Sequence, residues 1–350
     1  MSKDIKQKPK VLYSICGTGF GHISRAMALR ERLEKKYDVD YVIGGLTAKN
    51  NIFEDAKVIY SPMLYCKPDG DLDLVKTVLK LRPIKLIKEL FFTDHKIRNY
   101  DFVILDNEFI IGYKTFFMKG IKVVSYSHQN SFLFKETPQP KPKTLFEFFN
   151  RFVSNLVFKF FSPCKKENRL GFHYKKYNER IMYPFVSDYL IKNKDKVEEQ
   201  NKKIVVYLMN DLETIVKHLK RIPDYNFEIY HPDCPEEEQI HSDNVRVFKP
   251  NKQKFMDAIL SCEGVITKPG FTLTAEILFL NKKLMCIETS SHWETNCNAY
   301  ALAKFNVPTY EEFHFLNVIN WLRLKSKPAK LKGWTTPKEL IKEIKFISGL

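Results

Sequence analysis

The stretch VLYSICGTGFGHISRAMALRERL (residues 11–33) joins a short apolar run to a helical pattern through Gly17, Gly19 and Gly21. The run at 11–16 contains residues that favour strands, and after His22 the apolar residues recur three and four positions apart. A strand, a glycine turn and a helix in this order are typical of the first unit of a parallel α/β sheet. The backbone N–H groups of such a turn, at a helix N-terminus, favour a negative charge or a polar ligand.

The spacing of these glycines narrows the class of ligand. G-x-G-x-G differs from the dinucleotide fingerprint G-x-G-x-x-G, and the second predicted strand ends in Gly44 and Gly45, where that fingerprint requires an acidic residue. A nicotinamide or flavin enzyme is therefore disfavoured. Because no Gly-Lys-Ser/Thr follows the turn, a P-loop nucleotidase is excluded. A tight strand-to-helix connection without a ligand stays open as a purely structural interpretation.

The rest of the chain repeats this alternation in two series. Apolar runs separated by helical patterns predict parallel sheets covered on both faces, and two series in 350 residues predict two α/β domains. The polar segment 191–203 is interpreted as the linker between an N-terminal domain (1–190) and a C-terminal domain (204–350). Packing of the last helix back onto the first domain stays open. The predicted strands lie at 10–16, 39–44, 57–61, 101–106 and 121–126, and then at 203–209, 226–230, 245–248, 264–267 and 283–288.

Bulk composition limits the partners and the location. The formal net charge of +16 leaves nucleic acid, an anionic membrane surface and an acidic substrate open as partners. Seven cysteines without a CxxC pair or clustered histidines indicate neither a disulfide framework nor a zinc site. The first ten residues lack the apolar core of a secretory signal, and no segment has the length and apolarity of a membrane span. We therefore expect a cytoplasmic protein.

Two blocks of the sequence carry a family resemblance. GTGFGHISRAMALRERL (17–33) resembles the first-loop signature of GT-B glycosyltransferases of the family-28 type, which includes the lipid-linked GlcNAc transferase of peptidoglycan synthesis. Residues 247–305, from VFKPNKQKF to NAYALAKF, resemble the donor-binding block of that family, and residues 101–132 resemble an uncharacterised prokaryotic branch of it. The resemblance implies the GT-B fold, with two Rossmann-like domains whose parallel sheets face each other across a cleft. It also implies inverting transfer of a sugar from a nucleotide-sugar, a UDP-sugar, to a hydroxyl of a lipid-linked or cell-envelope glycan acceptor.

The donor is expected at the second block. Gly270 follows a predicted strand and precedes a helix, so that N-terminal amides can meet a diphosphate, with Lys268 and Thr272 as a charged donor and a hydroxyl donor beside the turn. Glu276 lies one turn deeper on the same helical face as Thr272, and the resemblance implies that it holds the ribose hydroxyls. The further donor contacts implied by the resemblance are Gly19, Gly21, Phe248 at the nucleobase, Glu294 at the sugar, and Asn298.

The chain departs from the family pattern at three places in this domain. Thr295 stands where many relatives carry Gln, and Lys268–Pro269 replaces an Arg-Ser or His-Gly pair. The segment that starts at Asn210, after the first strand of the domain, lacks the glycine loop of many relatives; Asn210 and Asp211 are predicted to cap the next helix instead.

The acceptor is expected at the loops of the N-terminal domain. Sugar transfer to a hydroxyl needs a base, and histidine suits this role because its ordinary pKa of ~6.5 leaves much of it neutral. The resemblance implies that His22 is this base, and a helix N-terminus disfavours its charged form. Asp106 is the alternative catalytic residue. Glu108, His128 and Asn130, on neighbouring loops, are predicted to bind the acceptor.

No catalytic metal or other cofactor is expected. No Asp-x-Asp stands in a metal-binding setting at a strand end, and the resemblance implies that helix ends and basic groups stabilise the leaving diphosphate. Three alternatives stay open, namely a sugar-nucleotide epimerase with the GT-B fold, an inactive relative that binds sugar or lipid, and a DNA-modifying glucosyltransferase.

Two segments combine basic residues with apolar and aromatic ones. Residues 72–92 interleave Leu, Val and Ile with Lys and Arg, and between 141 and 176 nine Lys or Arg stand against two Glu, a net charge of +7. A stripe of apolar residues at helical spacing usually packs on a sheet, but the phenylalanines of this second segment exceed one stripe. We expect peripheral contact with an anionic membrane surface, at the inner face of the membrane. Nucleic acid is the weaker alternative, because no recognised nucleic-acid motif occurs. The stripe is Phe146, Phe149, Phe152 or Val153, Leu156 and Phe160.

Overall fold

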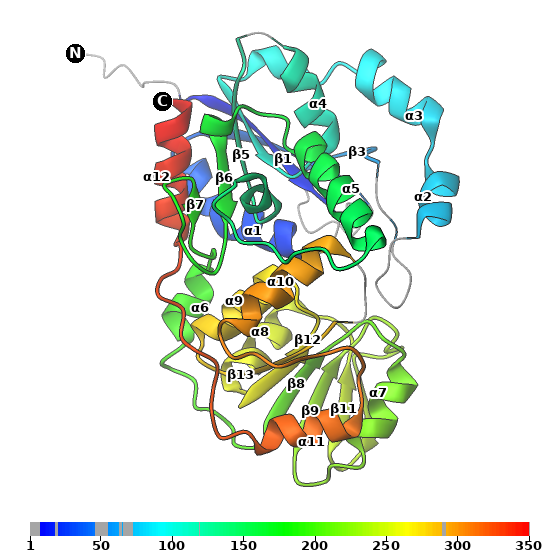
Figure 1. The fold of residues 1–350 in the computed structure, drawn as a ribbon. Coiled ribbons are helices and arrows are strands. Elements are labelled where there is room, and N and C mark those ends of the chain that lie inside the picture. The colour runs from blue at the N-terminus through cyan, green and yellow to red at the C-terminus, as the bar shows by residue number, and fades with distance from the viewer. Residues whose placement is uncertain are drawn as a thin grey trace, which may run out of the picture.

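The computed structural model describes residues 8–17, 20–45, 55–62, 65, 73–118, 120–288 and 292–349. They form two α/β units, each built on a seven-stranded sheet with helices packed on it (Figure 1). The architecture is that predicted from the sequence, two Rossmann-like domains with parallel sheets. All ten predicted strands are present, and their bounds differ from the predicted ones by at most two residues.

The N-terminal sheet has the strand order β3-β2-β1-β4-β5-β6-β7 and is parallel throughout. Its inner strand β1 is buried on both faces, as expected for a strand covered by helices on two sides. The strands are β1 (Lys10–Cys16), β2 (Asp38–Gly44), β3 (Lys57–Ile59), β4 (Phe102–Asp106), β5 (Lys122–Ser127), β6 (Arg169–Phe172) and β7 (Ile181–Met182).

Helices and short helical turns connect these strands. The π-helical turn η2 follows α3 directly, and α4 contacts both η2 and α5. The helical elements of this domain are α1 (Phe20–Glu34), α2 (Leu74–Lys80), α3 (Pro83–Ile87), η2 (Lys88–Phe92), η3 (Ile97–Asn99), α4 (Phe109–Phe117), η4 (Gln129–Leu133), α5 (Leu145–Phe161) and η5 (Lys166–Asn168).

The C-terminal sheet has the order β10-β11-β9-β8-β12-β13-β14, in which β10 alone pairs antiparallel. Its strands are β8 (Lys203–Tyr207), β9 (Asn226–Tyr230), β10 (Glu238–Ser242), β11 (Val245–Phe248), β12 (Gly264–Thr267), β13 (Lys283–Ile287) and β14 (Thr309–Tyr310). The helices in this part of the chain are α6 (Asp188–Asn193), α7 (Leu212–Leu219), α8 (Lys252–Ser261), α9 (Phe271–Phe279), α10 (Trp293–Ala303) and α11 (Phe315–Arg323), followed by the C-terminal helix α12 (Pro337–Ser348).

The chain crosses between the two domains twice. It first passes through α6 and residues 194–202 into β8, within the stretch interpreted as a linker. It returns at its C-terminus, where α12 packs against α1 and β5 of the first domain (Figure 1). Helix α12 starts with a capping box of Thr336 and Glu339 and with Pro337 in its first turn, the signals that mark a helix start.

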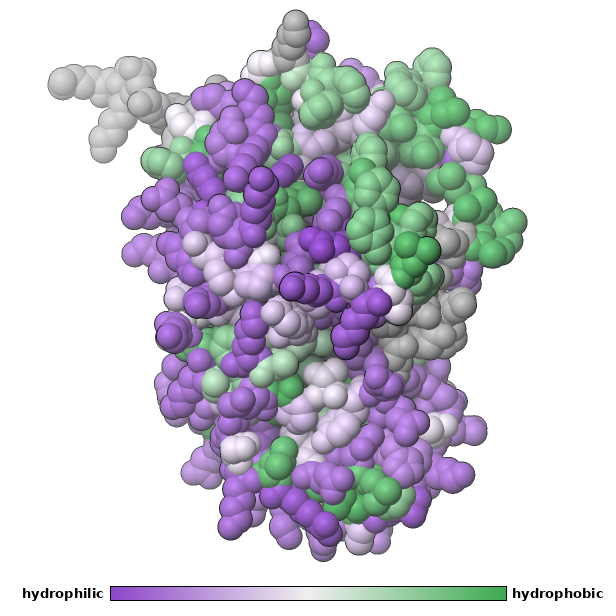
Figure 2. All heavy atoms as spheres, viewed as in Figure 1, coloured by the Kyte–Doolittle hydropathy of each residue, from purple (hydrophilic) through white to green (hydrophobic). Residues whose placement is uncertain are grey.

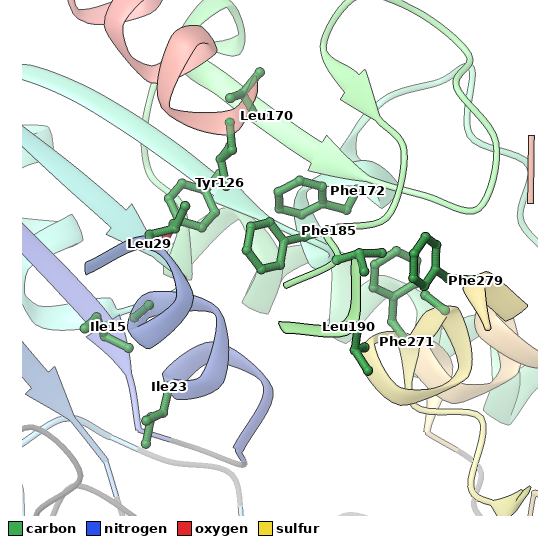
Figure 3. Close-up of a cluster of buried hydrophobic side chains, with 14 of the residues drawn as sticks. Ile15, Ile23, Leu29, Tyr126, Leu170, Phe172, Phe185, Leu190, Phe271 and Phe279 are labelled. Atoms are coloured by element: carbon green, nitrogen blue, oxygen red, sulfur yellow. The ribbon is translucent and has the colours of Figure 1, made fainter. Parts of the chain in front are cut away.

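One hydrophobic core runs through both domains. Phe172 and Phe185 of the first domain lie beside Phe271 and Phe279 of α9 (Figure 3). All four side chains are buried, and burying one phenylalanine contributes roughly 1.5–3 kcal/mol. Because this core crosses the domain boundary, it fixes how the loops of the two sheets meet.

Candidate active site at the domain boundary

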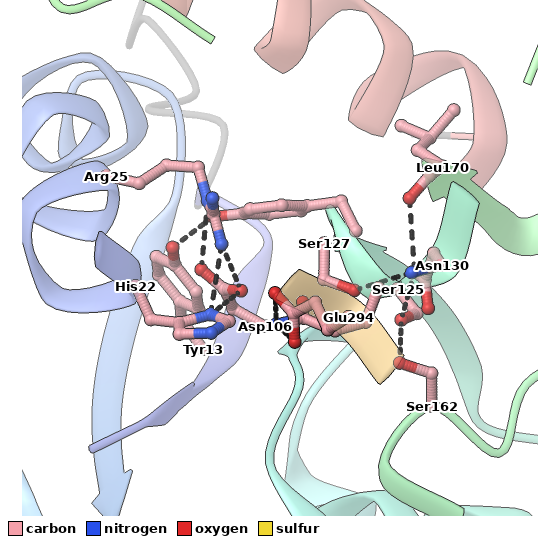
Figure 4. A network of polar contacts seen from close by, with 12 residues as sticks. Tyr13, His22, Arg25, Asp106, Ser125, Ser127, Asn130, Ser162, Leu170 and Glu294 are labelled. Carbon is pink, nitrogen blue, oxygen red and sulfur yellow. Dashed lines mark hydrogen bonds and ion pairs between the residues drawn. The ribbon is translucent and has the colours of Figure 1, made fainter. Parts of the chain in front are cut away.

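An ion pair and a histidine meet where β1 and β4 end. Asp106 is the last residue of β4 and is fully buried. Its Oδ1 lies 2.6 Å from His22 Nδ1 and accepts a hydrogen bond of 2.6 Å from Arg25 Nη2, while its Oδ2 accepts one of 3.1 Å from Arg25 Nε (Figure 4). Burial of Asp106 opposes its ionisation, but Arg25 and His22 outweigh that effect and lower the pKa of the carboxyl below its usual value.

This network fixes the tautomer of His22. An ionised Asp106 only accepts hydrogen bonds, so the His22 nitrogen that faces it, Nδ1, carries the proton. Arg25 Nη2 also lies 3.0 Å from Nδ1, but both groups are donors, and Arg25 therefore bonds to Asp106 instead. In a neutral ring with the proton on Nδ1, the lone pair lies on the other nitrogen, Nε2. The His22 side chain is 13% exposed.

Arg25 was missed by reasoning from the sequence. Its signal is its position: three residues after His22 on α1, a spacing that places two side chains on the same face of a helix. The guanidinium lies 5.5 Å from the ring centres of Tyr126 and Phe172, so that aromatic faces enclose it.

The two glycine turns predicted to bind ligand meet at the start of α1 and of α9. A Cβ atom on Gly21 would lie 3.0 Å from Thr272 Oγ1, so Gly21 lets these two helix starts touch. Gly270 is the N-cap of α9, is exposed, and would have no atom within 4 Å of a Cβ. Lys268 and Thr272 are both half-buried beside it. Gly19 lies outside the described residues.

The predicted ribose and nucleobase residues lie on α9 and at the end of β11. Glu276 is half-buried on α9, and burial raises its pKa to about 8, although the nearby Lys252 opposes the rise. Lys252 Nζ also lies 3.7 Å from Met27 Sδ of α1, so this side chain reaches across the domain boundary. Phe248 stacks on Tyr230 with their ring centres 5.2 Å apart.

Two of the predicted residues, His128 and Asn298, join the two domains to each other. His128, after β5, has its Nε2 2.6 Å from the Asn298 side-chain amide on α10, and its ring stacks on Phe271 at 3.7 Å. Its Nδ1 donates to Phe172 O at 2.8 Å, and burial lowers its pKa to about 3. Because Nδ1 carries the proton, the neutral Nε2 accepts, so the –NH2 group of the Asn298 amide is the donor that faces His128.

Glu294 also takes part in this contact between domains. Both of its carboxylate oxygens lie 3.3 Å from Gln129 Nε2 of η4. Its neighbour Trp293 is buried and donates from Nε1 to Gln139 Oε1 at 3.2 Å. The start of α10 is therefore attached to the N-terminal domain by polar and apolar contacts.

Glu108 and Asn130 lie deep within the N-terminal domain. Glu108 caps α4, accepting from the N–H groups of Ile110 and Ile111 at 2.9 Å each, and burial raises its pKa against these bonds. Asn130 Nδ2 donates to Ser125 Oγ at 3.0 Å and to Leu170 O at 3.1 Å. Both side chains are buried and hold the loops after β4 and β5 in place.

The places where the chain departs from the family pattern have local structural roles. Asp211 caps α7 by accepting from Thr214 N at 2.8 Å, and Asn210 O accepts from His231 Nε2 at 3.0 Å. Thr295 Oγ1 donates to His292 O at 2.7 Å at the start of α10.

Comparison with known proteins identifies the family. The family profile described as glycosyl transferase family 1 matches residues 9–321. The chain belongs to glycosyl transferase family 1. As a member of this family with the GT-B fold, the protein is a glycosyltransferase.

Solved structures with this fold align with nearly the whole length of this glycosyltransferase. The glycotransferase of kitacinnamycin has a TM-score of 0.56 at 13% identity, covering 98% of this chain and 91% of that one. The glycosyltransferase VinC in complex with dTDP has a TM-score of 0.55 at 11% identity, covering 97% and 99%. A protein described as a UDP-N-acetylglucosamine 2-epimerase of Listeria monocytogenes has a TM-score of 0.52 at 10% identity, covering 98% and 94%. No curated protein matches the sequence.

The described residues contain neither a cluster of metal ligands nor a helix suited to span a membrane. In the part of the chain that the structure describes, no three His, Cys, Asp or Glu side chains gather as they would around a metal ion. Over the same residues, none of the helices combines the length and the apolar character needed to cross a bilayer. The match to family 1 does not extend to the family-28 type or to peptidoglycan synthesis, which remain expectations from the sequence.

Proposed function

We propose that this glycosyltransferase moves a sugar from a UDP-sugar to a hydroxyl group of a lipid-linked or cell-envelope glycan acceptor, with inversion at the anomeric carbon. The observation that carries the proposal is the contact of 2.6 Å between His22 Nδ1 and Asp106 Oδ1. This contact keeps the proton on Nδ1 and leaves the lone pair of Nε2 to accept the proton of the acceptor hydroxyl.

The proposed transfer forms one bond, breaks one bond and moves one proton. The acceptor oxygen forms a bond to the anomeric carbon as its proton passes to His22 Nε2. The bond from the anomeric carbon to the diphosphate oxygen breaks on the opposite face, and its electron pair stays on the diphosphate. Asp106 stabilises the imidazolium that forms, and Arg25 holds Asp106 in position. Because Asp106 is fully buried, it acts through His22 and does not touch the acceptor.

The donor side of the proposal rests on α9. The exposed N-terminus of this helix, with Gly270, Lys268 and Thr272, suits a diphosphate because helix N-termini attract negative charge. Glu276 is then available for the ribose and Phe248 for the nucleobase. The dTDP complex of the structurally similar VinC supports a nucleoside diphosphate as the ligand class.

The proposal is tested by a thermal-shift screen of UDP-, dTDP-, GDP- and ADP-sugars. A ligand at ~100 times its Kd should stabilise the protein by roughly 2.7 kcal/mol. A UDP-sugar that shifts Tm most, followed by a glycoside product of inverted configuration, supports the proposal. An epimerised donor without acceptor indicates the epimerase, which a similar fold supports. A shift without any turnover indicates a binding protein, and no shift with any sugar nucleotide would overturn the donor assignment.

A further inference from the structure

The N-terminal domain presents an apolar face that its own fold does not cover. Most of the exposed large hydrophobic side chains in the described chain lie on three of its segments: residues 75–92, the end of α4, and α5. In Figure 2 these segments form green areas at the upper right, over the elements labelled α2, α3, α4 and α5 in Figure 1. We call this surface the α2–α5 face. Its exposed residues are Val75, Val78, Leu79, Leu81, Ile84, Ile87, Phe91, Phe92, Phe116, Phe117, Leu145, Phe146, Phe148, Phe149, Phe152, Leu156 and Phe160.

Helix α5 is attached to the protein on one side and exposes phenylalanines on the other. The stripe that a sheet usually covers points outward: Phe146 is 61% exposed, and Phe149 and Phe152 are each 57% exposed. The opposite side of the helix is attached to the protein by Ser154 and Phe158, and Phe158 belongs to a buried cluster with Trp293 of α10. The interpretation of the stripe as a sheet-packing face is therefore wrong for this helix.

Ring contacts join the segments into one face. Phe91 of η2 lies 6.3 Å from Tyr113 of α4, and Tyr113 lies 4.8 Å from Phe117. Phe109 of α4 lies 5.9 Å from Tyr113 and 5.6 Å from Phe161 of α5, so the ring contacts continue from η2 through α4 to α5. Between η2 and α4 the surface contains a hollow of about 540 Å³ whose lining includes Leu90, Phe91 and Phe117.

The charge of the same segments is positive. Residues 73–92 contain five Lys or Arg against two acidic residues, and residues 141–176 carry a net charge of +7. Lys76, Lys80, Arg82, Lys85 and Lys88 are all exposed among the apolar residues of the first segment. An apolar face with interspersed basic residues is the pattern of a surface that inserts at the boundary of an anionic bilayer.

We propose that the α2–α5 face docks the protein on an anionic lipid bilayer, with its phenylalanines and aliphatic side chains in the interface and its lysines at the headgroups. A second copy of the chain fits this face poorly, because two such basic surfaces would repel each other. Nucleic acid also fits poorly, because Val78, Leu79 and Ile84 offer no aromatic ring for a base to stack on. The proposal does not depend on sugar transfer. Since α5 contacts α10, docking brings the domain boundary close to the lipid.

The test measures binding of the full chain to vesicles of phosphatidylcholine alone or mixed with phosphatidylglycerol. We expect binding to the mixed vesicles that weakens as NaCl is raised. The triple variant Phe148→Ser, Phe149→Ser, Phe152→Ser should lower the partition coefficient at least about tenfold, because it removes apolar area from the interface. Lys80→Gln, Lys85→Gln and Lys88→Gln should each lower it about fivefold on the anionic vesicles only.

The matched control replaces exposed hydrophobic residues elsewhere, as Ile240→Ser, Leu316→Ser, Phe346→Ser, and should bind vesicles like the wild type. Phe158 is left unchanged because it is only 5% exposed and its loss would disturb the fold. An unchanged Tm shows that each variant is folded. The proposal is overturned if the wild type ignores anionic vesicles, or if the phenylalanine variant binds them normally. It is equally overturned if that variant only turns an oligomer into a monomer, or only abolishes binding of a single-stranded oligonucleotide.

Discussion

Gly21 at the start of α1 and Thr272 at the start of α9 lie in contact across the domain boundary, since a Cβ on Gly21 would be only 3.0 Å from Thr272 Oγ1. The two turns that the sequence marks with glycine are thus neighbours in space. The proposed base, His22, is the next residue after Gly21. The proposed diphosphate site, at Gly270, lies two residues before Thr272.

Gly21→Ala should therefore lower kcat/KM without unfolding the protein. Alanine favours a helix over glycine, but its methyl group must push the two helix starts apart by a few tenths of an ångström. We expect a loss of up to about tenfold in kcat/KM, because reacting groups are sensitive to small displacements. Gly270→Ala is the matched variant: it meets no atom in the free protein, so it should keep the wild-type Tm but raise the KM for the donor. Wild-type kinetics for both variants would show that neither turn touches substrate.

Much of the fold follows from local sequence patterns. The buried strands of both sheets are continuous apolar runs, which is why β1, β4, β8 and β12 were predicted within one or two residues. The strands that were missed, β6, β7, β10 and β14, are short or lie toward the sheet edges, and β10 alternates partly exposed polar residues. Their pairing is set by neighbours distant in sequence, which a local pattern does not contain.

The site was predictable in part for the same reason. The glycine turns and His22 can be recognised in the sequence because strand, turn and helix are adjacent there. The pairing of Asp106 with Arg25, and of His128 with Asn298, joins segments many residues apart and depends on how the sheets are arranged. Residues such as Glu108 and Asn130 look like ligand-binding residues in the sequence, yet buried loops use the same side chains to satisfy backbone and hydroxyl groups.

His22→Gln should lower kcat by roughly 10²–10⁴-fold with little change in donor affinity, the usual loss for a positioned base. Glutamine keeps an N–H that can donate to Asp106, so the buried pair of Asp106 and Arg25 is preserved. Single-turnover rates and donor Kd values measured on the same preparation separate the two effects. Near-normal transfer by a folded variant would remove His22 from the chemistry, and Asp106 could not replace it because it is fully buried.

Asp106→Ala should destabilise the protein by about 3–5 kcal/mol, because it leaves the Arg25 guanidinium buried without its partner. Adding Arg25→Met should restore a large part of this loss. Urea unfolding of both single variants and the double variant measures the coupling between the two residues. The lowered pKa of Asp106 means that its contribution is present at neutral pH and is lost as the pH falls below its unfolded value of ~3.9 and through its folded pKa. Simple additivity of the two single losses would contradict the pairing.

His128→Gln should make the protein less sensitive to mild acid. The folded pKa of His128 is about 3, below its unfolded value of ~6.5, so between these values only the unfolded chain binds the proton. The wild type should therefore lose stability as the pH falls from 6.5 towards 4, by up to ~1.4 kcal/mol per pH unit from this group. Unfolding free energies at pH 7, 6, 5 and 4.5 test this. His173, whose pKa is lowered to about 4, contributes to the pH dependence of stability equally in both proteins. Parallel curves of unfolding free energy against pH for wild type and variant would therefore refute the role of His128.

Donor binding should depend on pH through Glu276. Its pKa is raised to about 8, so it is mostly protonated at pH 6.5, whereas the ionised carboxylate is the form that accepts hydrogen bonds from both ribose hydroxyls. The Kd for UDP should therefore fall as the pH rises from 6.5 to 8, by up to about tenfold per pH unit, and level off above pH 8.

In Glu276→Gln this dependence should disappear, and at pH 9 the variant should bind UDP more weakly by roughly 1.5–3 kcal/mol, the value of hydrogen bonds to a charged group. Glu294→Gln is the matched control, because its proposed partner is the transferred sugar of the donor, which UDP lacks; it should keep the wild-type pH dependence. Isothermal titration calorimetry with UDP between pH 6.5 and 9 measures all three proteins. A flat profile for the wild type, or an unchanged profile in Glu276→Gln, would place the ribose away from α9.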